Sequence, residues 1–124
     1  MIAEFIIGLF IYLLTASIMI GIGVSQLKSK TPVAFYSGEK PFEAKELSDV
    51  SAWNRKHGIM WITYGIVILL SYLLSAVIGL DSACSLVLMT AGAIAPIAVM
   101  IWYHNRLIRT YRLPSENITK KRSI

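Results

Sequence analysis

The stretch "GIMWITYGIVILLSYLLSAVIGLDSACSLVLMTAGAIAPIAVMIWYH" (58–104) decides the fold, because it holds two long apolar runs with only Asp81 and Ser82 between them. Each run, about 58–80 and about 83–104, is long enough as a helix to cross roughly 30 Å of hydrocarbon. Inside lipid a segment must satisfy its own backbone hydrogen bonds, so we expect helices rather than isolated strands. The short connection predicts a tight antiparallel hairpin.

A third apolar run covers about 5–27, and the whole chain of 124 residues is 56% hydrophobic with a mean hydropathy of +0.63. A soluble domain needs more polar surface than this composition supplies. The chain begins "MIAEF", without the basic residues of a signal peptide, so we expect the first helix to stay uncleaved. The sequence therefore predicts one all-α membrane domain over 1–124 with three transmembrane helices.

The basic residues indicate the orientation, because they fall into two groups, one between the first two spans and one after the third. They are Lys28, Lys30, Lys40, Lys45, Arg55 and Lys56, and then Arg106, Arg109, Arg112, Lys120, Lys121 and Arg122. With three spans, both groups lie on one side of the membrane, and the positive-inside rule makes that side cytoplasmic. We expect the N-terminus outside and the C-terminus in the cytoplasm.

The sequence also argues against several classes of protein. No apolar run contains a charged residue, whereas a proton-coupled transporter needs an ionisable group at depth. The single cysteine, Cys84, excludes an intramolecular disulfide, and no Cys/His spacing suggests a zinc site. We expect no metal and no cofactor, and an enzyme is not favoured, because no nucleophile is indicated.

The segment between the first two spans, about 28–57, is too long for a simple connector. Its apolar residues predict a partly ordered loop. Ser48 is a candidate N-cap, and a helix that starts there would run into the second span. On that helix Gly58 and Gly65 would let another backbone approach closely, and loop segment 33–38 is one candidate to pack against them.

Polar and aromatic residues gather where the second span begins and the third ends, which predicts a binding site at the inner membrane interface. The candidate residues are Tyr36, Trp53, Asn54, His57, Trp61, His104, Asn105 and Arg106. The hairpin places His57 and His104 at one depth, so we expect them to lie near each other. An alternative stays open, in which these residues are ordinary interface anchors and helix caps.

Residues 105–124 form a basic tail in which Arg106, Arg109 and Arg112 recur every third position. We expect the third helix to continue until just before Pro114, and the three arginines to contact anionic lipid head groups. The bilayer is thus an expected partner, together with a second copy of the chain or another membrane protein. Nucleic acid is not expected.

Two sequence elements, "VAFYSGEKP" (33–41) and "AWNRKHG" (52–58), precede the second span. Over about 21–75 the chain resembles the SdpI-like family of small bacterial membrane proteins, in which a "GYRT-P"-like element is followed by "W-x-x-A-[HN]-[RK]-x-x-G". The arginine of the first element is absent here, with Ser37 and Gly38 near its place. The family's namesake is an immunity protein that protects a cell from a secreted toxin and relays a signal to a repressor. The resemblance implies a multi-pass protein of the bacterial plasma (inner) membrane.

Three functions remain open from the sequence. The first is a binding, signalling or immunity-like role through the cytoplasmic loop, favoured by the aromatic residues of the loop and the absence of charge within the spans. The second is a holin-like oligomeric pore former, which such a long inner loop disfavours. The third is a small membrane enzyme or lipid-binding protein with a polar site at the inner leaflet, which requires His57 and His104 to converge.

Overall fold

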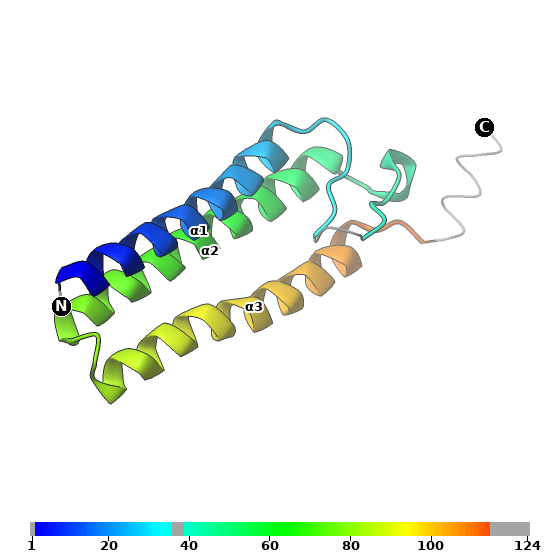
Figure 1. The fold of residues 1–124 in the computed structure, drawn as a ribbon. Coiled ribbons are helices and arrows are strands. Elements are labelled where there is room, and N and C mark those ends of the chain that lie inside the picture. The colour runs from blue at the N-terminus through cyan, green and yellow to red at the C-terminus, as the bar shows by residue number, and fades with distance from the viewer. Residues whose placement is uncertain (1, 36–38, 115–124) are drawn as a thin grey trace, which may run out of the picture.

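The computed structural model describes residues 2–35 and 39–114, and three long helices account for most of them (Figure 1). They are α1 (Ile2–Lys28), α2 (Val50–Ile78) and α3 (Ala83–Tyr111), with a short 3-10 helix, η1 (Ala44–Glu46), between α1 and α2. All three are long and apolar enough to cross a membrane, with mean hydropathies of 2.5, 2.1 and 2.2 in their most apolar windows. The prediction of an all-α chain with three candidate transmembrane helices is confirmed.

Helix α2 begins well before the apolar run that it contains. Its N-cap is Asp49, whose carboxylate accepts a hydrogen bond from the Ala52 amide at 3.0 Å. The prediction that Ser48 is the cap was therefore wrong by one residue. The Ser48 amide instead donates to the carbonyl of Tyr111 at 2.8 Å, which fixes the start of α2 beside the end of α3. Residues 50–57, counted with the loop in the predicted boundaries, form the first two turns of α2.

The turn between α2 and α3 is tight, as its length predicted. Gly79 adopts a positive φ of 122°, which a residue with a side chain rarely does. The Ser82 hydroxyl caps α3 by accepting from the Ser85 amide at 3.1 Å. Next to the turn, the hydroxyl of Ser85 donates to the carbonyl of Ser75 at 3.1 Å, and the hydroxyl of Ser75 donates back to the carbonyl of Ser85 at 3.4 Å. This reciprocal pair joins the helices at their hairpin end.

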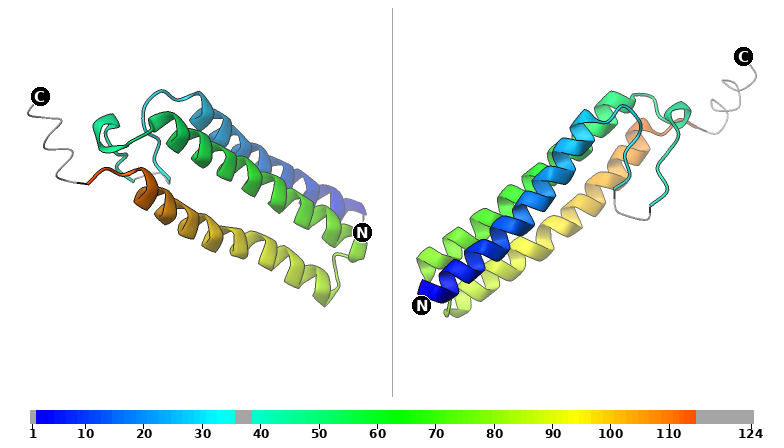
Figure 2. Two further views of the ribbon diagram at one scale, coloured as in Figure 1. Left: turned by 180° about the vertical axis from the view of Figure 1, so that it is seen from behind. Right: turned by 45° about the horizontal axis from the view of Figure 1, so that its top comes forward.

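Helices α1 and α2 lie side by side along their length (Figures 1 and 2). The closest approach is at two glycines: a Cβ built on Gly23 would lie 2.5 Å from the carbonyl oxygen of Gly58. A Cβ on Gly65 would lie 3.0 Å from the carbonyl oxygen of Ala16. The glycine face of α2 is thus covered by α1 and not by residues 33–35 of the candidate loop segment, whose other residues lie outside the described part of the chain. Small residues allow two helix backbones in lipid to approach closely, and α1 supplies such a residue, Gly23, opposite Gly58.

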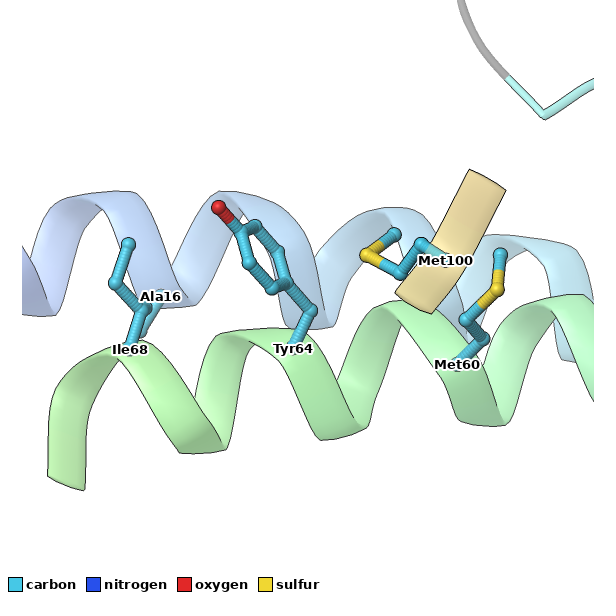
Figure 3. Packing of buried hydrophobic residues seen from close by; sticks show 5 residues of the cluster. All are labelled: Ala16, Met60, Tyr64, Ile68 and Met100. Carbon is cyan, nitrogen blue, oxygen red and sulfur yellow. The ribbon is translucent and has the colours of Figure 1, made fainter. Parts of the chain in front are cut away.

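Helix α3 lies on another side of α2 and makes fewer contacts with it (Figure 1). Between the two ends of the bundle, the core cluster consists of Ala16, Met60, Tyr64, Ile68 and Met100, which Figure 3 shows in a row along α2. The Tyr64 hydroxyl donates to the carbonyl of Ala93 at 3.0 Å and so links the two helices within this cluster. The outer faces of the helices carry exposed apolar side chains, as expected of surfaces that contact lipid.

Candidate functional site

Two histidines meet where α2 begins and α3 ends. The Nε2 atom of His57 lies 2.8 Å from Nδ1 of His104, and the two rings are nearly perpendicular, at 77°. His57 is fully buried, and His104 is 5% exposed. The antiparallel hairpin explains the meeting, because it brings the second turn of α2 to the level of the last two turns of α3. The expected proximity of the two histidines is therefore a feature of the structure.

The histidine pair is the centre of a longer hydrogen-bonded chain. On one side, Nδ1 of His57 lies 2.8 Å from the carbonyl oxygen of Trp53, one turn earlier in α2. On the other side, Nε2 of His104 lies 3.2 Å from Oε2 of Glu39, which comes from the loop. The second carboxylate oxygen of Glu39 accepts the amide of Phe35 at 2.9 Å. These hydrogen bonds between side chains therefore join α2, α3 and the loop.

The direction of these hydrogen bonds follows from the atoms at the two ends of the chain. A backbone carbonyl only accepts, so Nδ1 of His57 carries a hydrogen and donates to Trp53. In neutral His57 the Nε2 atom then accepts, and Nδ1 of His104 is the donor. Each contact between these three residues thus has a defined donor.

The last contact joins the end of α3 to the loop. Nε2 of His104 lies 3.2 Å from Oε2 of Glu39, and the side chains are 7% and 23% exposed. The pair therefore lies at the edge of the buried cluster, where the loop covers it.

A second set of contacts holds the beginning of the loop on α2. The side chain of Asn54 accepts from the Val33 amide at 3.1 Å, and its amide nitrogen donates to the carbonyls of Ser29 at 3.1 Å and Thr31 at 2.9 Å. The indole of Trp53 donates to the carbonyl of Val33 at 3.0 Å. Two buried side chains of α2 thus bind the backbone of an irregular segment that is itself only partly buried.

Aromatic rings cover the histidines from the loop side. Phe35 stacks on the ring of His104, with centroids 4.6 Å apart and planes at 19°, and it also lies 5.9 Å from the Trp61 ring. Phe42 meets Trp53 edge to face at 5.6 Å. These rings help to bury the two histidines, whereas the Glu39 side chain stays 23% exposed.

The end of the loop is joined to the end of α3 by backbone hydrogen bonds. Leu47 and Arg112 form an isolated antiparallel bridge, flanked by the bond from Ser48 to Tyr111 described above. The amide of Leu113 donates to the carbonyl of Glu46 at 2.7 Å. The loop is therefore attached both to α2 and to α3.

Of the eight predicted site residues, four come together in a buried cluster, two are exposed, one lies beside the cluster and one lies outside the described residues. Trp53, Asn54, His57 and His104 form the buried cluster, while Asn105 and Arg106 are exposed, and Arg106 lies over the Trp102 ring at 5.5 Å. The predicted Tyr36 lies outside the described residues. Trp61 contacts Phe35, but its indole nitrogen is buried without a hydrogen-bond partner among the described residues, as is Oε1 of Gln26.

The sequence reasoning missed Glu39, Phe35 and Gln26. Glu39 was considered only as a member of the element 33–41, although it is the single acidic residue between Lys28 and Phe42. That isolated acidic residue in a basic, aromatic loop was the available signal. Gln26 at the end of α1 donates to the carbonyl of Ala34 at 3.1 Å, which adds the first helix to the loop's supports.

The predicted lipid-facing arginines differ in their surroundings. Arg106, Arg109 and Arg112 are exposed, but Arg112 lies over the ring of Phe42 at 5.1 Å and so contacts the loop. Within residues 2–35 and 39–114, no group of three or more His, Cys, Asp or Glu side chains is arranged to hold a metal ion.

Comparison of the chain with family models, with curated proteins and with solved structures gave no significant match. The resemblance to the SdpI-like family stays a prediction from the two motifs.

Proposed function

We propose that this multi-pass membrane protein is a small bacterial inner-membrane protein that binds a partner or transmits a signal through its loop at 29–49, in an immunity-like role. The observation that carries the proposal is the fixation of this loop. Asn54 and Trp53 bind its backbone, and Glu39 joins it to His104. A connector needs no such support, whereas a recognition surface requires a defined shape.

The proposed orientation places this loop in the cytoplasm, with the N-terminus outside and the C-terminus inside. The support is the distribution of lysine and arginine, all of which lie at the loop end of the helices or in the tail. Fusions of a cytoplasm-active fluorescent protein and a periplasm-active phosphatase to the C-terminus test it. Fluorescence without phosphatase activity is expected, and the reverse result contradicts the proposed orientation.

The function is tested by replacing loop residues 33–35 and 39–41 with glycine and serine in the full-length chain. In a bacterium that lacks the gene, the wild-type chain is expected to restore the deletion phenotype and the replaced chain is not. A matched control replaces Thr15 and Ser17, which lie in α1 away from the loop, with alanine. Full rescue by the loop replacement, at equal amounts of protein in the membrane, contradicts the proposal.

The contact between His57 and His104 favours a second candidate, a ligand-binding or enzymatic role of the polar site itself. The pair meets the condition that the two side chains converge. This second candidate function ranks below the first, because both histidine rings are buried and already have partners. A ligand would reach the rings only if the loop moved away from them. Turnover or ligand binding that is lost in both His57→Ala and His104→Ala, with the fold intact, would favour this candidate over the first.

A further inference from the structure

A groove lies between α2 and α3, apart from the histidine site. The two helices are joined at one end by the Ser75–Ser85 pair and at the other by the histidines. Between these ends they leave a groove of about 730 Å³, and none of its lining residues comes from α1. Its rims include Ile59 and Val99, which are 51% and 60% exposed, so the groove opens to the surroundings of the helices.

The length of the groove along the helices matches the thickness of the hydrocarbon layer of one leaflet. Along α2 it extends from Lys56 to Val67, and along the antiparallel α3 from Tyr103 to Ala91. At the helical rise per residue, this length is roughly 16 Å, about half the thickness of the hydrocarbon core. A lipid of the leaflet on the loop side has its acyl chain at this depth.

The chemistry of the groove changes from one end to the other. Towards the hairpin its walls are apolar or small, with Ala91, Gly92 and Ala95 among them. The hydroxyl of Tyr64, which also lines it, is already bonded to the carbonyl of Ala93. Among the described residues that line the groove, Lys56 is the single charged one, and it lies at the end nearest the loop. Its ammonium lies 5.1 Å from the centre of the Tyr111 ring.

We propose that the groove binds one acyl chain of an anionic phospholipid, whose phosphate lies at Lys56. The apolar part of the groove has the length of an acyl chain, and the charge lies where the head group of that leaflet would be. Tyr103 and Tyr111 flank Lys56 and supply hydroxyl groups that donate to phosphate oxygens. The helices of the described chain leave the groove open to such a ligand, and the site is independent of the proposed role of the loop.

The role of Lys56 is tested by native mass spectrometry of the full-length protein. The protein is released from bilayers of equal parts phosphatidylglycerol and phosphatidylcholine, and the lipid that it retains is identified. The wild-type chain is expected to retain phosphatidylglycerol preferentially. Lys56→Gln is expected to lower this preference roughly five-fold, since one basic residue near anionic head groups contributes about that factor. The control, Arg55→Gln, removes the same charge from an exposed neighbour outside the groove and is expected to keep the preference.

A second pair of variants tests the groove itself. Ala95→Phe fills it at an exposed position and is expected to reduce retention of both lipids, while Ala98→Phe, exposed on α3 outside the lining, is expected to leave retention unchanged. An unfolding temperature equal to that of the wild type shows that each variant is folded. Equal retention of the two lipids by the wild type, equal effects of Lys56→Gln and Arg55→Gln, or full retention by Ala95→Phe would overturn the proposal.

The other possible occupant, a helix of a second copy, has its own readout. Val99→Cys is placed at the rim of the groove in a Cys84→Ser background, because Cys84 is exposed near the hairpin. Mild oxidation is expected to leave this variant monomeric. Efficient formation of a disulfide-linked dimer in bilayers would assign the groove to a second copy and overturn the lipid proposal.

Discussion

Asn54 binds the backbone of Val33 across a gap of 21 residues in the chain, with its side-chain oxygen 3.1 Å from the Val33 amide. The same side chain donates to two further carbonyls of the loop, so one buried residue of α2 holds the loop at three points. Trp53 adds a fourth hydrogen bond beside it. The shape of the loop therefore depends on two adjacent side chains of a helix.

Asn54→Ala is expected to release the loop, because it removes three hydrogen bonds to the loop backbone, and within the described residues only the Thr31 carbonyl keeps a second donor, the Ser29 hydroxyl. Each hydrogen bond of this kind contributes about 0.5–1.5 kcal/mol. Hydrogen exchange of the Val33 amide is expected to become at least ten-fold faster. The control, Asn105→Ala, removes an exposed amide side chain from α3 and is expected to leave the exchange rate unchanged. Equal exchange in the Asn54→Ala variant and the wild type would contradict this account.

The position of Glu39 predicts that its side chain holds the loop against α3. Glu39→Ala removes the carboxylate that contacts Nε2 of His104 and accepts from the Phe35 amide. Exchange of the Phe35 amide is expected to become faster, because a hydrogen bond of this kind contributes about 0.5–1.5 kcal/mol. Equal exchange of this amide in the Glu39→Ala variant and the wild type would contradict the account.

The matched control for this prediction is Glu46→Ala, which removes a carboxylate from η1 in the same loop. It is expected to leave the exchange rate of the Phe35 amide as in the wild type. NMR of the histidine ring nitrogens tests the direction of the hydrogen bonds at His57. This ring is expected to carry its hydrogen on Nδ1, as a donor to the carbonyl of Trp53. A hydrogen found on Nε2 of His57 instead would contradict that direction.

The contact of α1 with α2 predicts a sharp difference between two glycines of α1. A Cβ on Gly23 would meet the backbone oxygen of Gly58 at 2.5 Å, whereas one on Gly21 would meet nothing within 4 Å. Gly23→Ala is expected to lower the free energy of unfolding by about 1–3 kcal/mol through overpacking. Gly21→Ala is expected to be neutral or slightly stabilising, because alanine favours the helix. Unfolding in mixed micelles measures both, and equal effects would exclude the close packing.

The reciprocal hydroxyl bonds between Ser75 and Ser85 predict coupling between these residues at the hairpin end. Hydrogen bonds between helices in a membrane contribute about 0.6 kcal/mol on average. A double-mutant cycle with Ser75→Ala and Ser85→Ala is expected to give a coupling free energy of that order. Ser71, whose hydroxyl donates to the carbonyl of Val67 in its own helix, is the control partner and is expected to show additive effects with Ser85→Ala.

The sequence by itself determined the three helices and the α2–α3 hairpin. Length, apolarity and the absence of charge are local properties, and lipid leaves the helix as the solution for such a segment. The hairpin followed from its two-residue connection, and it was enough to place His57 and His104 at one level. The cap of α2 was missed by one residue, because Ser48 and Asp49 are both good caps and only the backbone conformation distinguishes them.

The tertiary structure alone decided which surfaces meet. The partner of His104 is Glu39, 65 residues away in the chain, and no local pattern connects the two. Likewise, Gly58 and Gly65 predicted that another backbone approaches α2 closely, but the sequence did not show which segment it is. In the structure that segment is α1. Burial, hydrogen-bond direction and the fit of one backbone against another depend on all three helices and the loop at once. These interactions act through space rather than along the chain, and so they appear only when the chain is folded.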